Sequence, residues 1–205
     1  KERSLYLVFN DIHEKSARAG IPKKIINDAK NIYKQVSEKK ISRGANRKGI
    51  IASCVYFSCK LNNVPRSTKE IAKIFDLNIT VMTKGVKLFQ NIVQLNDLKK
   101  SLVNSNFIQT ESIKAPDFIE RFCSKLSMSD EDISIIKEMS EKAELNNLVG
   151  QNTPPSIAAG CIYLYCLINS KNTISKKDIS DVCLISEVTI NKCYRKLYDN
   201  KELIL

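Results

Sequence analysis

The chain contains an internal repeat, and this duplication limits its possible folds more than any other feature. The segment Ile50–Cys59 recurs as Ile157–Cys166, with a Cys, a Tyr and a second Cys at matching positions 107 residues apart. Two further pairs of segments match at an offset of 108: Thr68–Ala72 with Lys176–Ser180, and Lys84–Lys87 with Lys192–Arg195. The 205-residue chain is therefore two copies of one unit, each of about 100 residues and able to bury its own core.

Each copy is predicted to contain five helices. In the first copy, one amphipathic helix ends at Gly20, a second begins with Pro22 in its first turn, and a third runs from about Asn46 to Leu61. Cap residues mark the other two starts: Ser67 with Glu70, and Asn78 or Thr80. The starts in the second copy are Ala115, Ser129 with Asp132, Thr153 with Pro154, Ser175 with Asp178, and Ser186.

The third helix of each copy determines the fold class, because it is apolar nearly all round. Such a helix must be surrounded by the others, so each copy is predicted to be a compact domain rather than one turn of a solenoid. No strand pattern of useful length appears. The prediction is an all-α protein with two tandem five-helix domains, residues 1–94 and 113–205, and a linker at 95–112 that is rich in Asn, Ser and Lys.

The cysteines and the single histidine restrict the chemistry that this chain can perform. Cysteines five residues apart lie inside apolar segments, no C-x-x-C occurs, and His13 is the only histidine. Neither a zinc site nor a catalytic triad fits this pattern, and no glycine-rich phosphate loop is present. We therefore predict free buried thiols in a reducing compartment, no catalytic, metal or cofactor site in this segment, and no enzymatic activity.

Charge is distributed unevenly along the chain, which carries a formal net charge of +11. Residues 1–105 hold 21 Lys and Arg against 8 Asp and Glu, a net of +13, whereas residues 106–205 hold 12 against 14, a net of −2. This pattern favours a polyanionic partner held mainly by the first copy, although solvated basic faces are also common. No long apolar run or signal peptide indicates a membrane partner, and a first residue of Lys rather than Met indicates a fragment.

Several runs of residues in both copies form a recognisable pattern. They are Ile32–Val36, Ser42–Asn46, Ala52–Tyr56 and Val64–Ile71 in the first copy, and Phe118–Leu126, Pro154–Tyr163 and Glu187–Arg195 in the second. In this order, over nearly the whole chain, they resemble the two cyclin-like repeats of the transcription factor IIB (TFIIB) family and its archaeal counterpart. The resemblance implies a core that binds a TATA-binding protein on promoter DNA and helps to recruit DNA-dependent RNA polymerase.

The resemblance also implies segments that this sequence does not contain. In the family, an amino-terminal zinc ribbon docks on the polymerase, and a following reader segment enters its cleft. If the chain is a fragment, the resemblance places both of them upstream of Lys1.

A helix-turn-helix is predicted in the second copy at about residues 175–198. A capped helix from Ser175 to Cys183 is followed by a turn and by a second helix from Glu187 to Tyr198. The second helix would present Val188, Thr189 and Asn191 to base edges, with Lys192, Arg195 and Lys196 for phosphates. Two capped helices of this length are common, and the equivalent pair in the first copy can serve packing alone.

Asn191 sets this chain apart from the family that it resembles, which commonly carries Arg at this position. Arg suits paired contacts with guanine O6 and N7 in a GC-rich element upstream of TATA. The Asn amide instead matches adenine N6 and N7, and Val188 offers an apolar face to a thymine methyl group. The sequence therefore predicts an upstream preference that is weak or shifted toward A·T pairs.

A second DNA contact is implied by the resemblance, in the minor groove downstream of TATA. It corresponds to the loop before the apolar helix, here Arg43, Gly44 and Ala45. Arg43 keeps a basic residue and Gly44 permits close backbone approach, whereas Ala45 replaces a polar or basic residue often found there. Arg47 and Lys48 stand at the helix start, where backbone N–H groups can also face a phosphate. The alternative is a glycine turn surrounded by solvated charges.

Two other functions remain open from the residues. A cyclin that activates a protein kinase has the same two domains, and a helical adaptor would bind only proteins. The basic first half and the Gly-Ala-Asn and Val-Pro-Arg-Ser-Thr-Lys-Glu-Ile runs favour the transcription factor. Richness in Lys, Ile and Asn indicates an AT-rich genome, such as that of a protist or a large DNA virus. The expected location is the nucleus for a cellular protein, or a cytoplasmic virus factory for a viral one.

Overall fold

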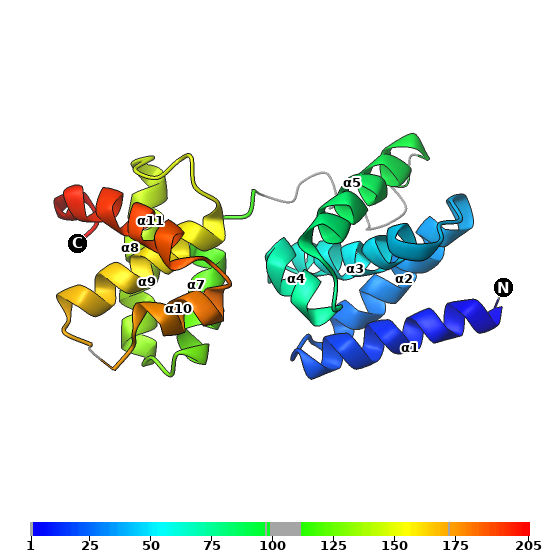
Figure 1. Ribbon diagram of the computed structural model, residues 1–205, viewed down its shortest axis with the longest axis horizontal. Coiled ribbons are helices and arrows are strands. Elements are labelled where there is room, and N and C mark those ends of the chain that lie inside the picture. Colours follow the sequence, from blue (N-terminus) through cyan, green and yellow to red (C-terminus); the bar gives the residue numbers. More distant parts are fainter. Residues whose placement is uncertain (1, 97, 99–111, 172) are drawn as a thin grey trace. The chain divides into compact units, whose positions relative to one another are not determined.

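A computed structural model of the protein describes residues 2–96, 98, 112–171 and 173–205. Within these ranges the regular structure is helical and contains no strand, which confirms the all-α prediction. The chain divides into two compact units, Lys1–Glu111 and Ser112–Leu205, here called repeat one and repeat two. Figure 1 shows α1 to α5 in repeat one and α7 to α11 in repeat two.

The helices of repeat one are α1 (Glu2–Arg18), α2 (Lys23–Lys39), α3 (Gly44–Leu61), α4 (Thr68–Ile74) and α5 (Ile79–Leu95). Those of repeat two are α7 (Pro116–Lys125), α8 (Asp130–Leu145), α9 (Pro154–Ile168), α10 (Lys176–Cys183) and α11 (Glu187–Asp199), followed by a short 3₁₀ helix, η1 (Lys201–Leu203). Within the described residues each repeat thus contains five α-helices, which confirms the predicted tandem architecture.

Most of the predicted helix starts agree with the structure, since side-chain caps act locally. The serine hydroxyl and the acidic side chain three residues later form reciprocal capping boxes at α4, α8 and α10. Asn78, rather than Thr80, caps α5, because its Oδ1 accepts from the Thr80 N–H at 2.9 Å. Two starts differ by one or two residues: Pro22 precedes α2 with non-helical backbone, and α3 begins at Gly44.

The predicted central helices lie at the core of both repeats. Every residue of Gly49–Val55 in α3 and of Pro155–Ile162 in α9 is buried. Around α3 pack α1, α2, α4 and α5, and around α9 pack α7, α8, α10 and α11. The absence of a polar face on these two helices is therefore explained by their position.

Small residues allow the last helix of each repeat to cross its central helix closely. A Cβ atom built on Gly85 of α5 would lie 2.4 Å from the carbonyl carbon and oxygen of Gly49 in α3. In repeat two, a Cβ atom on Gly160 of α9 would lie 2.7 Å from the Cβ of Cys193 in α11. The offset of 108 makes Gly85 and Cys193 equivalent positions, so repeat one has a glycine on both helices of the crossing, whereas repeat two has one only on α9.

The backbone turns repeat as well. Asp76 between α4 and α5 has a φ of 53°, and Leu184 between α10 and α11 has a φ of 57°. These residues are 108 positions apart and end their helices with the same left-handed conformation. The loops after the central helices match in the same way, with positive φ at Asn63 and Ser170.

The predicted linker lies largely outside the described residues. Of the range 95–112, Leu95 ends α5 and Leu98 is buried against the core of repeat one, while residues 99–111 are not described. The linker therefore stays a prediction. Among the described residues, no helix is both long enough and apolar enough to cross a lipid bilayer.

We expect the seven cysteine thiols to be unreactive in the folded protein. All seven are buried and none forms a disulfide, and burial raises the pKa of Cys123 to about 12 and that of Cys193 to about 11. Ellman's reagent at pH 8 should label none within minutes in buffer and all seven in guanidinium. Elemental analysis provides a second check, because stoichiometric zinc that survives dialysis would contradict a chain whose described residues hold no cluster of metal ligands.

Candidate nucleic-acid interface

Helices α10 and α11 form a capped pair joined by a tight turn. The Ser175 hydroxyl accepts from the backbone N–H of Asp178 at 3.1 Å, and the Asp178 carboxylate accepts from the N–H of Ser175 at 2.8 Å. Leu184 ends α10 in the left-handed conformation, and Ser186 caps α11 by accepting from the Thr189 N–H at 3.3 Å. The pair has the proportions of a helix-turn-helix, as predicted.

One face of α11 is exposed along its whole length. Ile190, Cys193 and Leu197 hold the opposite face in the core of repeat two. The exposed face carries Val188, which is 64% exposed, together with the basic residues Lys192, Arg195 and Lys196. An apolar residue in the first turn followed by three cations suits a helix that meets base edges first and phosphates next.

The other two predicted base-reading residues lie at the edges of this face. The Thr189 hydroxyl is 2.8 Å from that of Ser186, so it belongs to the helix cap. Asn191 is half-buried, one helical turn before Tyr194. The structure therefore brings Val188, Lys192 and Arg195 to the centre of the exposed face and places Thr189 and Asn191 beside it.

A ladder of rings and cations, which the sequence analysis missed, supports the Asn191 side of α11. The ring centroids of Tyr163 in α9 and Tyr194 in α11 are 5.1 Å apart, and those of Tyr194 and Tyr198 are 5.7 Å apart. Lys176 lies 4.8 Å from the Tyr163 ring and Lys201 lies 4.8 Å from the Tyr198 ring. The sequence does contain a signal for this ladder, because Tyr194 and Tyr198 are four residues apart and therefore lie on the same side of a helix.

The loop before α3 presents a basic residue and a glycine to solvent. Arg43 has an extended backbone and no side-chain cap, and Gly44 has a φ of 56°. No atom lies within 4 Å of a Cβ built on Gly44, so its conformation, rather than crowding, requires glycine. Arg43 and Lys48 are exposed, and among the described residues neither side chain makes a hydrogen bond or ion pair.

Arg47 differs from its two basic neighbours because its guanidinium is already engaged. Its Nε donates to the hydroxyl of Tyr33 at 3.1 Å, and its Nη2 donates to Oγ of Ser4 at 2.7 Å. This side chain thereby joins α1, α2 and α3. A phosphate contact by Arg47 stays a prediction, whereas its contribution to the packing of repeat one was not foreseen.

Comparison with known proteins identifies the repeats. The model of the transcription factor TFIIB repeat matches residues 1–92 and 108–200. The chain is 36% identical to a putative transcription initiation factor IIB-like protein of Acanthamoeba polyphaga mimivirus, over 96% of this chain and 44% of that protein. It is 31% identical to transcription initiation factor IIB of Glycine max, over 100% of this chain and 62% of that protein. It is 28% identical to transcription initiation factor IIB of Homo sapiens, over 96% of this chain and 58% of that protein.

These relatives are longer proteins, and this chain spans about half of their length. The match nevertheless covers both repeats, in the order that the internal duplication indicates, and includes the helix-turn-helix and the loop before α3. The chain belongs to the transcription factor IIB family.

Proposed function

We propose that this chain is the core of a transcription initiation factor that binds a complex of TATA-binding protein and promoter DNA and helps to recruit DNA-dependent RNA polymerase. The observation that carries the proposal is the exposed basic face of α11, which begins at Val188 and continues through Arg195 within a capped helix-turn-helix. The names of the relatives, all transcription initiation factors, support the same role.

Each repeat has its own task in this proposal. Helix α11 enters the major groove upstream of TATA, and the Arg43–Gly44 loop approaches the minor groove downstream of it. Repeat one supplies most of the attraction to phosphates, because the first 105 residues carry a net charge of +13. Transcription initiation by this factor takes place in the nucleus if the source is cellular, or in a cytoplasmic virus factory if the source is viral.

Purification of the native full-length protein tests the assignment. We expect polymerase subunits and a TATA-binding protein to co-purify. In the family, polymerase contact involves a zinc ribbon and a reader segment that precede the repeats, so the longest natural form must be used. Co-purification of a protein kinase instead of these proteins would contradict the proposal and would support the alternative that the chain is a cyclin.

Reversing the charge of Arg43 and Lys48 together should weaken binding to a TATA-binding protein on TATA DNA by tenfold or more. Both side chains are exposed, whereas Arg47 is left intact because its loss would disturb the packing of three helices. Loss of about two phosphate contacts should lower the slope of log affinity against log salt by about 2. Fluorescence anisotropy between 50 and 200 mM salt, a range in which counterion release dominates, measures both quantities.

A charge-matched variant provides the control. Lys23 and Lys24 are exposed at the opposite end of α2 from the loop, and their replacement by Glu changes the net charge equally. Equal losses in the two double variants would assign the effect to the general field of repeat one. Unchanged affinity in Arg43→Glu/Lys48→Glu would show that the loop is a solvated surface.

The replacement Asn191→Arg should move the upstream sequence preference toward G. A guanidinium pairs with guanine O6 and N7 and adds about 1 to 3 kcal/mol of discrimination at that base, which the Asn amide cannot supply. Selection from random DNA flanking a fixed TATA element measures the change. Lys196→Arg serves as the control, because it places a guanidinium on the same helix at a position expected to meet phosphate. A GC-rich element selected by the unmodified protein would refute this interpretation of Asn191.

A further inference from the structure

Both repeats contain a groove at the same place in the fold. In repeat one it has a volume of about 620 Å³ and lies among the start of α1, the end of α2 and the start of α3. In repeat two it has a volume of about 680 Å³ and lies among the start of α7, the second half of α8 and the start of α9. The offset of 107 pairs Ile50 with Ile157 and Arg47 with Pro154, so corresponding residues line the two grooves.

The groove of repeat one already holds a guanidinium of this chain. Arg47 extends from α3, donates to the hydroxyl of Tyr33 in α2 and to Oγ of Ser4 in α1, and so connects the walls of the groove. Repeat one therefore shows which chemical group this architecture accommodates. The planar guanidinium, with five N–H donors, can contact several walls at once.

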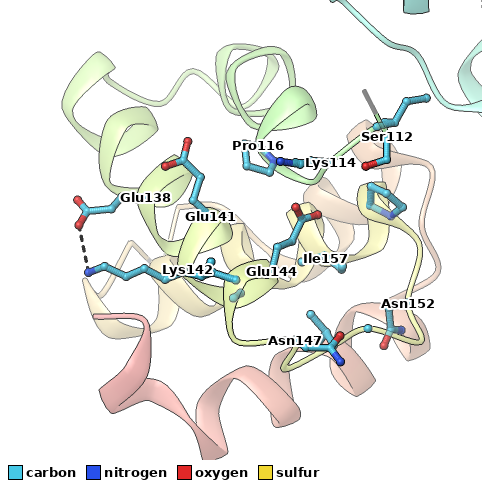
Figure 2. Close-up of a pocket in the computed structure, with 16 residues that line it drawn as sticks. Ser112, Lys114, Pro116, Glu138, Glu141, Lys142, Glu144, Asn147, Asn152 and Ile157 are labelled. Atoms are coloured by element: carbon cyan, nitrogen blue, oxygen red, sulfur yellow. Dashed lines mark ion pairs between the residues drawn. The ribbon is translucent and has the colours of Figure 1, made fainter. Parts of the chain in front are cut away.

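The groove of repeat two lacks this side chain and carries acceptors in its place. Pro154 occupies the position equivalent to Arg47 and has no donor to offer. Three glutamates of α8 line the groove: Glu138, Glu141 and Glu144. Figure 2 shows them together with Lys114 and Pro116, which face them.

These glutamates are only partly neutralised. Lys142 pairs with Glu138 at 3.0 Å, and one oxygen of Glu144 accepts from the backbone N–H of Ala115 at 2.6 Å. Glu141 makes no hydrogen bond or ion pair within the described part of the chain. The wall formed by α8 thus keeps carboxylate oxygens available to a cation.

A buried acceptor in the same groove also lacks a donor. Oδ1 of Asn152, just before α9, is inaccessible to solvent and has no hydrogen-bond partner among the described residues. A buried polar atom without a partner costs about 1 to 3 kcal/mol, so a small movement of this loop that let an incoming N–H group reach Oδ1 would remove a penalty. This observation is independent of the charge on α8 and points to the same ligand chemistry.

The floor of the groove is apolar, and the other polar lining residues, Ser112, Lys114 and Asn147, are exposed. Ala143, Val149 and Ile157 are buried, and Pro116 and Pro154 complete the rim. A long side chain can lay its methylene groups on such a surface while its charged end reaches the carboxylates. The apolar floor, the free carboxylate of Glu141 and the unpaired acceptor of Asn152 together match one natural side chain, that of arginine.

We propose that the groove of repeat two, formed by α7, α8 and α9, binds an arginine side chain of a partner protein, in the position that Arg47 occupies in repeat one. The site lies on a protein-binding rather than a DNA-binding surface, because its three carboxylates outnumber the two lysines of the lining, Lys114 and Lys142, and would repel phosphate. It is therefore independent of the function proposed above for α11 and for the Arg43–Gly44 loop.

The experiment uses the full chain and a defined peptide, acetyl-Ala-Ala-Arg-Ala-Ala-amide. Amide chemical shifts are followed by NMR as the peptide is added at low salt, and the same peptide with citrulline, which is isosteric but neutral, is the matched ligand. We expect saturable shifts confined to residues 112–116 and 138–157, and binding by the citrulline peptide that is at least tenfold weaker. Shifts scattered over both repeats, or equal binding of the two peptides, would overturn the proposal.

Two variants locate the binding site. Glu141→Gln should weaken the arginine peptide about fivefold to tenfold, since a charge-assisted hydrogen bond is replaced by a neutral one. Glu131→Gln, on the exposed part of the same helix but outside the groove, should have no effect. Equal affinities in the wild-type chain and in Glu141→Gln would exclude the carboxylate as the recognition element.

The replacement Pro154→Arg recreates the arrangement of repeat one. The new guanidinium should fill the groove from within, so that the peptide no longer produces shifts, while the thermal midpoint stays the same or rises. Binding to TATA-binding protein on DNA should not change. Full peptide binding by a folded Pro154→Arg chain would show that the groove is not the site.

Discussion

Replacement of Gly85 by alanine should lower the free energy of unfolding of repeat one by about 3 kcal/mol or more, because the crossing of α3 and α5 has no room for a methyl group. The new Cβ would lie 2.4 Å from the carbonyl of Gly49, and the obstructing atoms are backbone, which no rotamer change can move. Alanine is the better helix former by about 1 kcal/mol, so a loss of stability cannot come from helix propensity.

Peptide-resolved hydrogen exchange of the full chain measures this effect in each repeat separately. We expect Gly85→Ala to abolish protection in α3 and α5 while α9 and α11 keep theirs. Lys84→Ala is the matched control, since Lys84 precedes Gly85 in α5 and is exposed. Wild-type protection in the Gly85→Ala chain would mean that α5 can shift away from α3 at little cost.

The second large effect concerns a buried carboxylate in repeat two. Asp132 is 5% exposed, and its Oδ1 accepts from the hydroxyl of Tyr165 at 2.6 Å. Its Oδ2 pairs with Lys171 at 2.5 Å and accepts from the Ser129 N–H at 3.2 Å, which closes the cap of α8. Asp132→Asn should lower the free energy of unfolding at pH 7 by about 2 to 3 kcal/mol, because the buried carboxylate loses the charge that pairs with the partly exposed Lys171.

The pH dependence of that effect follows from the same contacts. Hydrogen bonds from Lys171 and Tyr165 hold the pKa of Asp132 well below its usual range. A carboxyl group whose folded pKa is depressed stabilises the fold above its unfolded pKa of about 4, and this stabilisation is lost as the pH falls through the folded value. The difference between wild type and Asp132→Asn should therefore be full at pH 7 and shrink progressively below pH 4.

Urea unfolding at several pH values, followed by signals from repeat two, measures this difference. Asp130→Asn is the control, because Asp130 lies in the same turn of α8 and is exposed. It should change stability by only a few tenths of a kcal/mol, as surface changes usually do. A wild-type advantage that stays constant from pH 7 to pH 2 would show that the charge of Asp132 is not what stabilises the fold.

The helices of this protein could be predicted because their start signals are local. A serine hydroxyl and an acidic residue three positions later satisfy backbone groups within one turn, so Ser67, Ser129 and Ser175 mark helix starts without knowledge of the fold. The duplication also pairs the last helices of the two repeats and makes Gly85 and Cys193 equivalent positions.

The state of individual side chains at the candidate sites could not be predicted, because long-range contacts determine it. Arg47 has the same charge as Arg43 and Lys48, and only packing against Ser4, 43 residues earlier, distinguishes it. Asn191 occupies a base-reading position by sequence, yet it lies half-buried beside the tyrosine ladder. Likewise, the offset of 107 pairs Arg47 with Pro154, but the residue pattern does not reveal that these positions line a groove in each repeat.

The crossing glycines also bear on how a duplicated gene can evolve. Gene conversion between the two halves would place the α11 segment in repeat one and bring Cys193 to the position of Gly85, where even a methyl group collides with Gly49. The reverse exchange would leave an unfilled space beside Gly160 in repeat two. Each last helix is thus compatible only with its own central helix, and selection against such exchange allows the two halves to keep diverging in sequence and in partners.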